Sequence, residues 1–193
     1  LTALNEMRQS LSFRIAQATL FQQQNASESA EQLAQLAEVI LQAVLELAKA
    51  EIESSHGVIE CVGIAVVGYG SVGAKELGFA SDLDLVFLHN ADASAVSNGV
   101  RALDAPRYFA RLAQKIISLM QTITPAGRLY EVDMRLRPDG AKGLLVSSVD
   151  SFEMYQKTRA WTWEHQALVR SRSLAGDTGV RVRFEEIRTQ ALQ

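Results

Sequence analysis

Apolar residues recur every three or four positions in the first quarter of the chain, which is the spacing of one helix face. This pattern predicts two amphipathic helices, over residues 4–21 and about 28–54. Between them, Asn25 precedes Glu28 by three residues, which is the spacing of a capping box. We therefore expect an N-terminal helical hairpin, residues 1–57, that packs on a main domain of residues 58–193.

Two short β-rich runs follow, at residues 62–67 and 83–88, on either side of a glycine cluster at residues 68–73. A strand that enters a glycine cluster predicts a tight loop. Residues 74–77 have room for only one or two helical turns, so the two strands are expected to be neighbours in one sheet.

The rest of the chain mixes helical and strand patterns. Residues 91–104 have no periodicity and predict a loop, whereas an apolar stripe after Pro106 predicts a helix. Residues 128–137 alternate between apolar and charged side chains, which predicts a strand with one core face and one charged face. A turn at residues 138–140 and a short strand at 144–146 come next, and the spacing from Asp150 onward indicates helices.

Composition excludes several classes of protein. No apolar stretch approaches the roughly 20 residues that span a bilayer, so a membrane protein is not expected. A net charge of −3 and a pI near 5.7 give no general attraction to nucleic acid. The single Cys61 lies in an apolar run and is expected in the core, which fits a reducing, cytoplasmic setting. The sequence opens without methionine or a signal-peptide pattern, and we expect it to be part of a longer protein.

The first chemical motif is the pair Asp82 and Asp84, two residues apart on a predicted strand, so both carboxylates leave the same face. Like charges this close are unfavourable unless one takes up a proton or cations neutralise them. Carboxylate oxygens suit Mg²⁺, which is also bound by water and substrate phosphates. An alternative is a pair of solvent-facing acids at a strand end.

Neighbouring residues favour the metal site. Gly70 and Ser71 precede the acids in a tight turn whose backbone amides suit a phosphate. A third acid, Asp133, lies on the polar face of the later predicted strand and is expected to converge with the first two. Arg135 and Arg137 share that face, and guanidinium groups suit phosphate oxygens.

Two better-known phosphate loops do not fit. The segment from Gly68 to Lys75 lacks the order of a nucleoside-triphosphatase P-loop, because Glu76 follows the lysine. A dinucleotide fingerprint matches only in part at residues 68–73, and the Asp82 pair arrives too soon for a ribose-binding acid.

These residues together resemble the nucleotidyltransferase superfamily, which implies an α+β fold: a mixed β-sheet with packed helices, here preceded by the helical hairpin. The amino-acid sequences of several longer segments resemble the glutamine synthetase adenylyltransferase family across about residues 60–180. The segments that carry this resemblance are 67–70, 76–78, 81–87, 130–133, 135–138 and 161–170.

The resemblance implies an enzyme with two related halves, of which one attaches AMP from ATP to a glutamine synthetase tyrosine and the other removes it by phosphorolysis. Segments 130–133 and 161–170 are more similar to the AMP-attaching half. It also implies two Mg²⁺ ions on Asp82, Asp84 and Asp133, with Asp133 as the base. Control by a PII-type nitrogen signal protein would act through the full-length enzyme.

By the same resemblance, Gly70 and Ser71 hold the departing phosphates, and Arg135, Arg137 or Lys75 offset their charge. Two positions depart from the family pattern: Ser71 stands where lysine is usual, and Ala74 where a second glycine is usual. The alternatives to AMP attachment are the phosphorolytic half, which would yield ADP, and a nucleotide-binding module without catalysis.

Overall fold

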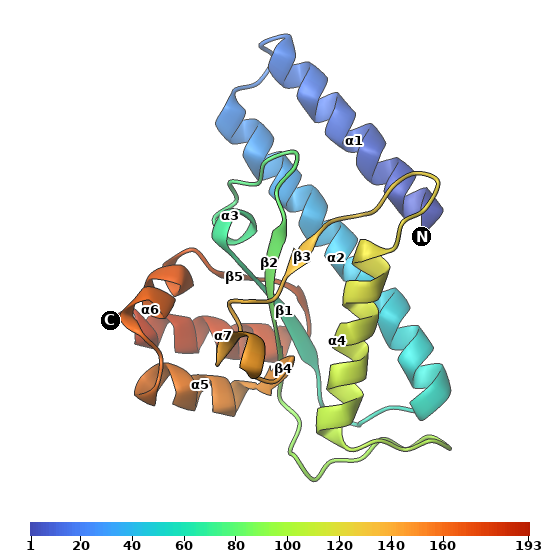
Figure 1. The fold of residues 1–193 in the computed structure, drawn as a ribbon, viewed down its shortest axis with the longest axis vertical. Coiled ribbons are helices and arrows are strands. Elements are labelled where there is room, and N and C mark those ends of the chain that lie inside the picture. Colours follow the sequence, from blue (N-terminus) through green and yellow to red (C-terminus); the bar gives the residue numbers. More distant parts are fainter.

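The computed structural model describes residues 1–193, except for the side chain of Ala141, and is a mixed five-stranded sheet with helices on both faces (Figure 1). The predicted α+β fold class is therefore confirmed. The elements in chain order are α1 (Thr2–Leu20), α2 (Ala26–His56), β1 (Ile64–Tyr69), α3 (Gly70–Gly73), β2 (Leu83–His89), α4 (Ala105–Gln121), β3 (Val132–Asp133), η1 (Gly140–Lys142), β4 (Val146–Ser148), α5 (Val149–Thr158), α6 (Thr162–Val169), β5 (Arg172–Gly176) and α7 (Thr178–Ala191).

The sheet is built around β1, which pairs antiparallel with β2 on one edge and with β5 on the other. The predicted neighbouring strands are thus confirmed. The free edge of β2 takes two short parallel partners, β3 near its start and β4 near its end. In this register Asp84 lies opposite Tyr69 on one side and Asp133 on the other.

Each face of the sheet has its own apolar cluster. In β2, Leu83, Leu85 and Phe87 are buried with residues of α2 and α4, whereas Val86 and Leu88 are buried with residues of α5 and α7. This alternation follows from the two-residue period of a strand. Asp84 has the same parity as Val86, so its carboxylate lies on the α5–α7 face, where β2 begins.

The N-terminal hairpin is confirmed, and Figure 1 shows α1 running back along α2. Glu28 N–H donates to Asn25 Oδ1 at 2.9 Å and Asn25 N–H to Glu28 Oε2 at 2.8 Å, which is the predicted capping box. Helix α2 packs into the same cluster as β1 and β2. Leu4, Leu11 and Ile15 of α1 also pack against this cluster, although Asn5 is the one fully buried residue of α1 and Phe13 is 63% exposed. The division at residue 57 stays a prediction.

Helix α4 begins as its sequence predicts. Asp104 is the N-cap and accepts a hydrogen bond from Arg107 N–H at 3.0 Å, and Pro106 occupies the first turn, where a missing N–H costs nothing. Of the predicted stripe, Phe109, Leu112 and Ile116 are buried and Leu119 is partly buried. None of the described helices is both long and apolar enough to cross a membrane.

Several boundaries differ from the prediction. Residues after Asp150 are not all helical, because Arg172–Gly176 forms β5. Gly176, at φ +108°, and Asp177, which caps α7 through Val180 N–H, separate this strand from the helix that follows. Cys61 is exposed in a turn at φ +58° and not in the core, since β1 begins only at Ile64. The strand expected at residues 144–146 lies at Val146–Ser148.

Candidate active site

The glycine turn lies directly after β1 and faces a carboxylate. Gly70 has φ +56°, and a Cβ added to it would lie 2.6 Å from Asp84 Oδ2. Only glycine fits there without strain. Ser71 follows in α3, so the helical turn begins at Gly70 and not at residue 74 as expected. Ala74 has ordinary right-handed helical backbone angles, so its methyl group imposes no strain on the turn.

Asp84 and Asp133 are register neighbours in the parallel pair of β2 and β3. Asp82 is exposed and immediately precedes β2. Burial raises the pKa of the Asp84 carboxyl above its usual value, and the charges of Asp133 and Asp82 raise it further. Asp84 therefore lies close enough to both Asp133 and Asp82 for their negative charges to act on its carboxyl group.

The strand that was expected over residues 128–137 is much shorter, because only Val132–Asp133 pairs with β2. The reason is local. Arg135 N–H donates to Asp133 Oδ1 at 2.8 Å, so the aspartate side chain closes a turn that ends the strand. The alternation of side chains along this segment therefore stops at Asp133.

The Arg135 side chain also contacts Asp133. Its Nε donates to Asp133 Oδ2 at 2.7 Å and its Nη2 lies 2.5 Å from the same oxygen, while the side chain stays 84% exposed. These hydrogen bonds hold the pKa of Asp133 below its usual value. Asp133 is consequently an ionised acid that an exposed arginine already neutralises.

The other two predicted cations have structural contacts. Arg137 donates to the carbonyl oxygens of Met134 at 2.6 Å and Gly143 at 3.5 Å, and its charge helps to lower the pKa of Asp133. Lys75 lies in the left-handed region at φ +60°, and its Nζ pairs with Glu31 of α2 at 3.0 Å. Arg135 and Arg137 are thus brought to Asp133, whereas Lys75 is directed at α2.

The chemistry of these donors fits Mg²⁺, although the acids are not gathered into a finished ligand set. Among the described residues, no group of three or more His, Cys, Asp or Glu side chains is placed to hold a metal ion. The Asp84 carboxylate is nevertheless repelled by the charges of its acidic neighbours. A bound cation would offset this repulsion. Binding would require Asp133 to exchange Arg135 for the metal.

One contact at the turn is absent from the sequence prediction. Strand β5 places Arg172 behind α3, where it donates to the carbonyl oxygens of Val72 and Gly73. The helical prediction for this segment concealed that contact. The available signal is the pair Gly176 and Asp177, a helix stop and cap that mark the preceding residues as a separate element.

A family model described as glutamate-ammonia ligase adenylyltransferase matches residues 1–187. The chain belongs to this family. The matched range includes α1 and α2, which lie outside the residues, about 60–180, that carry the sequence resemblance.

Relatives in this adenylyltransferase family agree over the whole chain. A protein of Stenotrophomonas maltophilia strain R551-3 is 54% identical over 190 residues, 98% of this chain and 20% of its own length. One from Xanthomonas axonopodis pv. citri strain 306 is 55% identical over 193 residues, 100% of this chain and 20% of its own length. Both are named bifunctional glutamine synthetase adenylyltransferase/adenylyl-removing enzyme. The chain spans about a fifth of the length of these relatives.

Proposed function

We propose that this chain transfers AMP from ATP to a tyrosine of glutamine synthetase, in the cytoplasm and with Mg²⁺ bound. The observation that carries the proposal is the placement of Asp84 beside Asp133 and against Gly70, in a member of an adenylyltransferase family. The two acids are suited to hold a metal ion and the turn to hold phosphate, which are two needs of nucleotidyl transfer.

Asp82, Asp84 and Asp133 are the residues that would hold magnesium, as one ion or two. A metal bound there would neutralise triphosphate charge and polarise the attacked phosphorus. The backbone of Gly70 and Ser71 orients the departing phosphates.

The cations flank this arrangement. Arg135 is exposed, and once it leaves Asp133 its guanidinium is free to bind phosphate oxygens. We assign Arg137 and Lys75 weaker, charge-only roles, because each already holds structural contacts.

Asp133 acts as the base in this proposal. A tyrosine hydroxyl has a pKa of about 10, so little phenolate exists at neutral pH and a proton acceptor is needed. A carboxylate is ionised at neutral pH and can accept that proton. The hydrogen bonds from Arg135 lower the pKa of Asp133 and weaken it as a base, so in this proposal Arg135 leaves Asp133 before the transfer. The tyrosine oxygen forms a bond to the α-phosphorus, the bond from that phosphorus to the bridging β-phosphate oxygen breaks, and pyrophosphate leaves.

A second candidate is removal of AMP by phosphorolysis, which the name of the relatives favours equally because it includes both activities. Here orthophosphate attacks the adenylylated tyrosine and ADP is released. The same acids and the same turn would serve this reaction. In either direction, we propose that a PII-type signal protein acts on the activity through a longer polypeptide.

A labelling experiment separates the two directions. The chain is incubated with Mg²⁺, ATP labelled at the α-phosphate and purified glutamine synthetase, and label on the synthetase is measured. In parallel, adenylylated synthetase and orthophosphate are supplied and ADP is measured. We expect labelled synthetase without ADP; ADP formation alone would replace our proposal by the phosphorolytic one. Neither product, from a folded chain that binds Mg²⁺–ATP, would indicate a non-catalytic nucleotide-binding module.

A further inference from the structure

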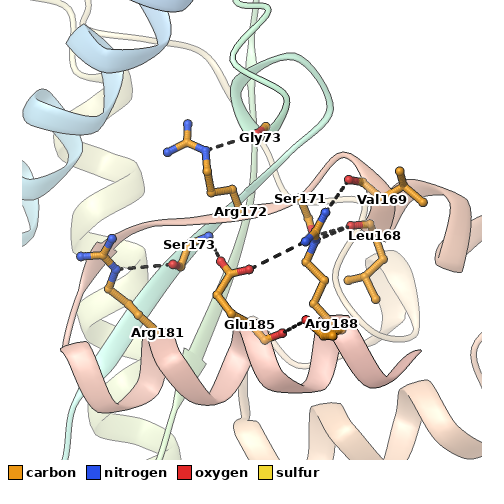
Figure 2. Close-up of polar contacts among 10 residues, drawn as sticks. Gly73, Leu168, Val169, Ser171, Arg172, Ser173, Arg181, Glu185 and Arg188 are labelled. Carbon is orange, nitrogen blue, oxygen red and sulfur yellow. Dashed lines mark hydrogen bonds and ion pairs between the residues drawn. The ribbon is translucent and has the colours of Figure 1, made fainter. Parts of the chain in front are cut away.

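Behind the glycine turn, on the side away from Asp84, a single guanidinium joins three elements of the fold. Arg172 Nη2 donates to the Val72 carbonyl at 3.1 Å. Its Nε donates to the Gly73 carbonyl at 3.3 Å, a contact that Figure 2 shows. The same Nη2 lies 2.6 Å from Glu38 Oε1 of α2. Strand β5, the turn and α2 are therefore tied at one point.

The chemistry of this contact suits the end of a short helix. The last carbonyl groups of a helix have no partner within it, and a cation is favourable beside them. The side chains of Arg172 and Glu38 are each only 25% exposed, so water competes weakly with their ion pair. A planar guanidinium can contact two carbonyls and a carboxylate at once, which lysine cannot do.

The backbone restricts the turn further. Gly68, which leads into the turn, is the register partner of Arg172 in the β1–β5 pair. A Cβ on Gly73 would lie 2.2 Å from the carbonyl oxygen of Arg170, so the turn packs directly on the start of β5. On the other side of the turn, a Cβ on Gly70 would lie 2.6 Å from Asp84 Oδ2, so the two residues are close together. Any shift of the turn away from β5 would therefore change the position of Gly70 relative to Asp84.

From these contacts we infer that Arg172, held by Glu38, is a positioning residue for the nucleotide. It touches neither the acids nor the reacting atoms, and acts by holding the Gly70–Gly73 turn where its amides meet the triphosphate. This inference rests on the proposed function, because it assumes that the turn binds phosphate.

Arg188 provides a matched control within the same region. It also donates to two carbonyl groups at the end of a helix, Leu168 at 3.1 Å and Val169 at 2.8 Å, as Figure 2 shows. Those carbonyls belong to the end of α6 and not to the turn. Arg188→Met thus removes two hydrogen bonds of the same kind and leaves Arg172 and its contacts with the turn in place.

The test is calorimetric titration of the full chain with Mg²⁺–ATP, together with thermal melting. For Arg172→Met we expect about tenfold weaker affinity, because the released turn would have to be ordered when the nucleotide binds, with binding stoichiometry unchanged. Arg172→Lys, which keeps the pairing with Glu38, should recover part of the affinity and carries the test if the methionine variant does not fold. Arg188→Met should bind like the wild type.

The outcomes distinguish positioning from support of the fold. A merely structural role would lower the stoichiometry, through misfolded protein, while the remaining sites keep wild-type affinity. That result overturns the inference, as does equal weakening by Arg188→Met. Wild-type affinity in both Arg172 variants would overturn it and leave the proposed function standing, whereas no binding by the wild type would overturn both.

Discussion

The two ends of strand β2 each carry a titratable side chain, and they have opposite surroundings. His89, 6% exposed, stacks on Phe109 with ring centroids 4.5 Å apart, and Ala91 N–H donates to its Nδ1 at 3.1 Å. Asp84, at the other end, is partly buried beside Asp82 and Asp133. Burial favours the neutral form of both groups, so it lowers the pKa of His89 and raises the pKa of Asp84.

Only one of these groups has neighbours that suit its neutral form. Every described contact of His89 is satisfied by an uncharged imidazole, so it is a packing residue. The acids around Asp84 add repulsion to the cost of burial, and nothing but Arg135 opposes it. A perturbed titratable group therefore indicates function only where its neighbours leave the perturbation uncompensated.

Replacing Asp133 with asparagine should have the largest effect, because it removes the proposed base and one end of the acid pair. We expect Asp133→Asn to lower the rate of AMP transfer about 10³-fold, as loss of a general base commonly does. Most Mg²⁺–ATP affinity should remain. Initial rates of label transfer measure the rate of AMP transfer, and calorimetry measures the affinity. A variant whose transfer rate is within about threefold of the wild-type rate would remove Asp133 from the mechanism.

A smaller effect is expected at Asp82, which is exposed and acts on the site mainly through its charge. Asp82→Asn should weaken Mg²⁺-dependent nucleotide binding about tenfold, the loss of roughly one cation contact. Asp92→Asn is the matched control, since Asp92 is an exposed acid beyond the opposite end of β2. If both variants bind Mg²⁺–ATP like the wild type, Asp82 is not a metal ligand.

This contrast between the ends of β2 could be predicted only in part from sequence. The D-x-D spacing and the alternation of β2 placed the acids on one face, because strand period is a local property. The strand pattern predicted that Asp84 and Asp133 would lie close together. It did not predict how short the strand of Asp133 is, because the hydrogen bond from Arg135 N–H to the Asp133 side chain ends that strand. The role of β5 was missed because five residues between two helices carry too weak a periodic signal.

At the His89 end, the prediction concerns stability. Its lowered pKa means that the unfolded chain, with an ordinary value of 6.5, binds a proton first as pH falls. The stability contributed by neutral His89 is thus present above pH 6.5 and lost as pH falls through the lowered folded value.

His89→Phe keeps the stack on Phe109 but leaves Ala91 N–H without its acceptor, at a cost of about 1 kcal/mol. The deficit should shrink as pH falls from about 7.5 to 5.5, because only the wild type titrates. Denaturant unfolding at both pH values measures it. A deficit that is constant with pH would mean that His89 is readily protonated in the folded state.

At the Asp84 end, we expect the smallest effect and the opposite sign. A raised folded pKa means that ionisation is less favourable in the folded chain, so wild-type stability relative to an uncharged side chain declines as pH rises above the ordinary value of 3.8. Asp84→Asn should therefore melt about 1–2 °C higher than the wild type near pH 7, and the gain should vanish near pH 4. Saturating Mg²⁺ should also erase it, because the metal would stabilise only the wild type. A variant that melts below the wild type near pH 7 without Mg²⁺ would show that Arg135 already offsets the repulsion on Asp84. Neither end of β2 would then carry a titratable group whose surroundings are uncompensated.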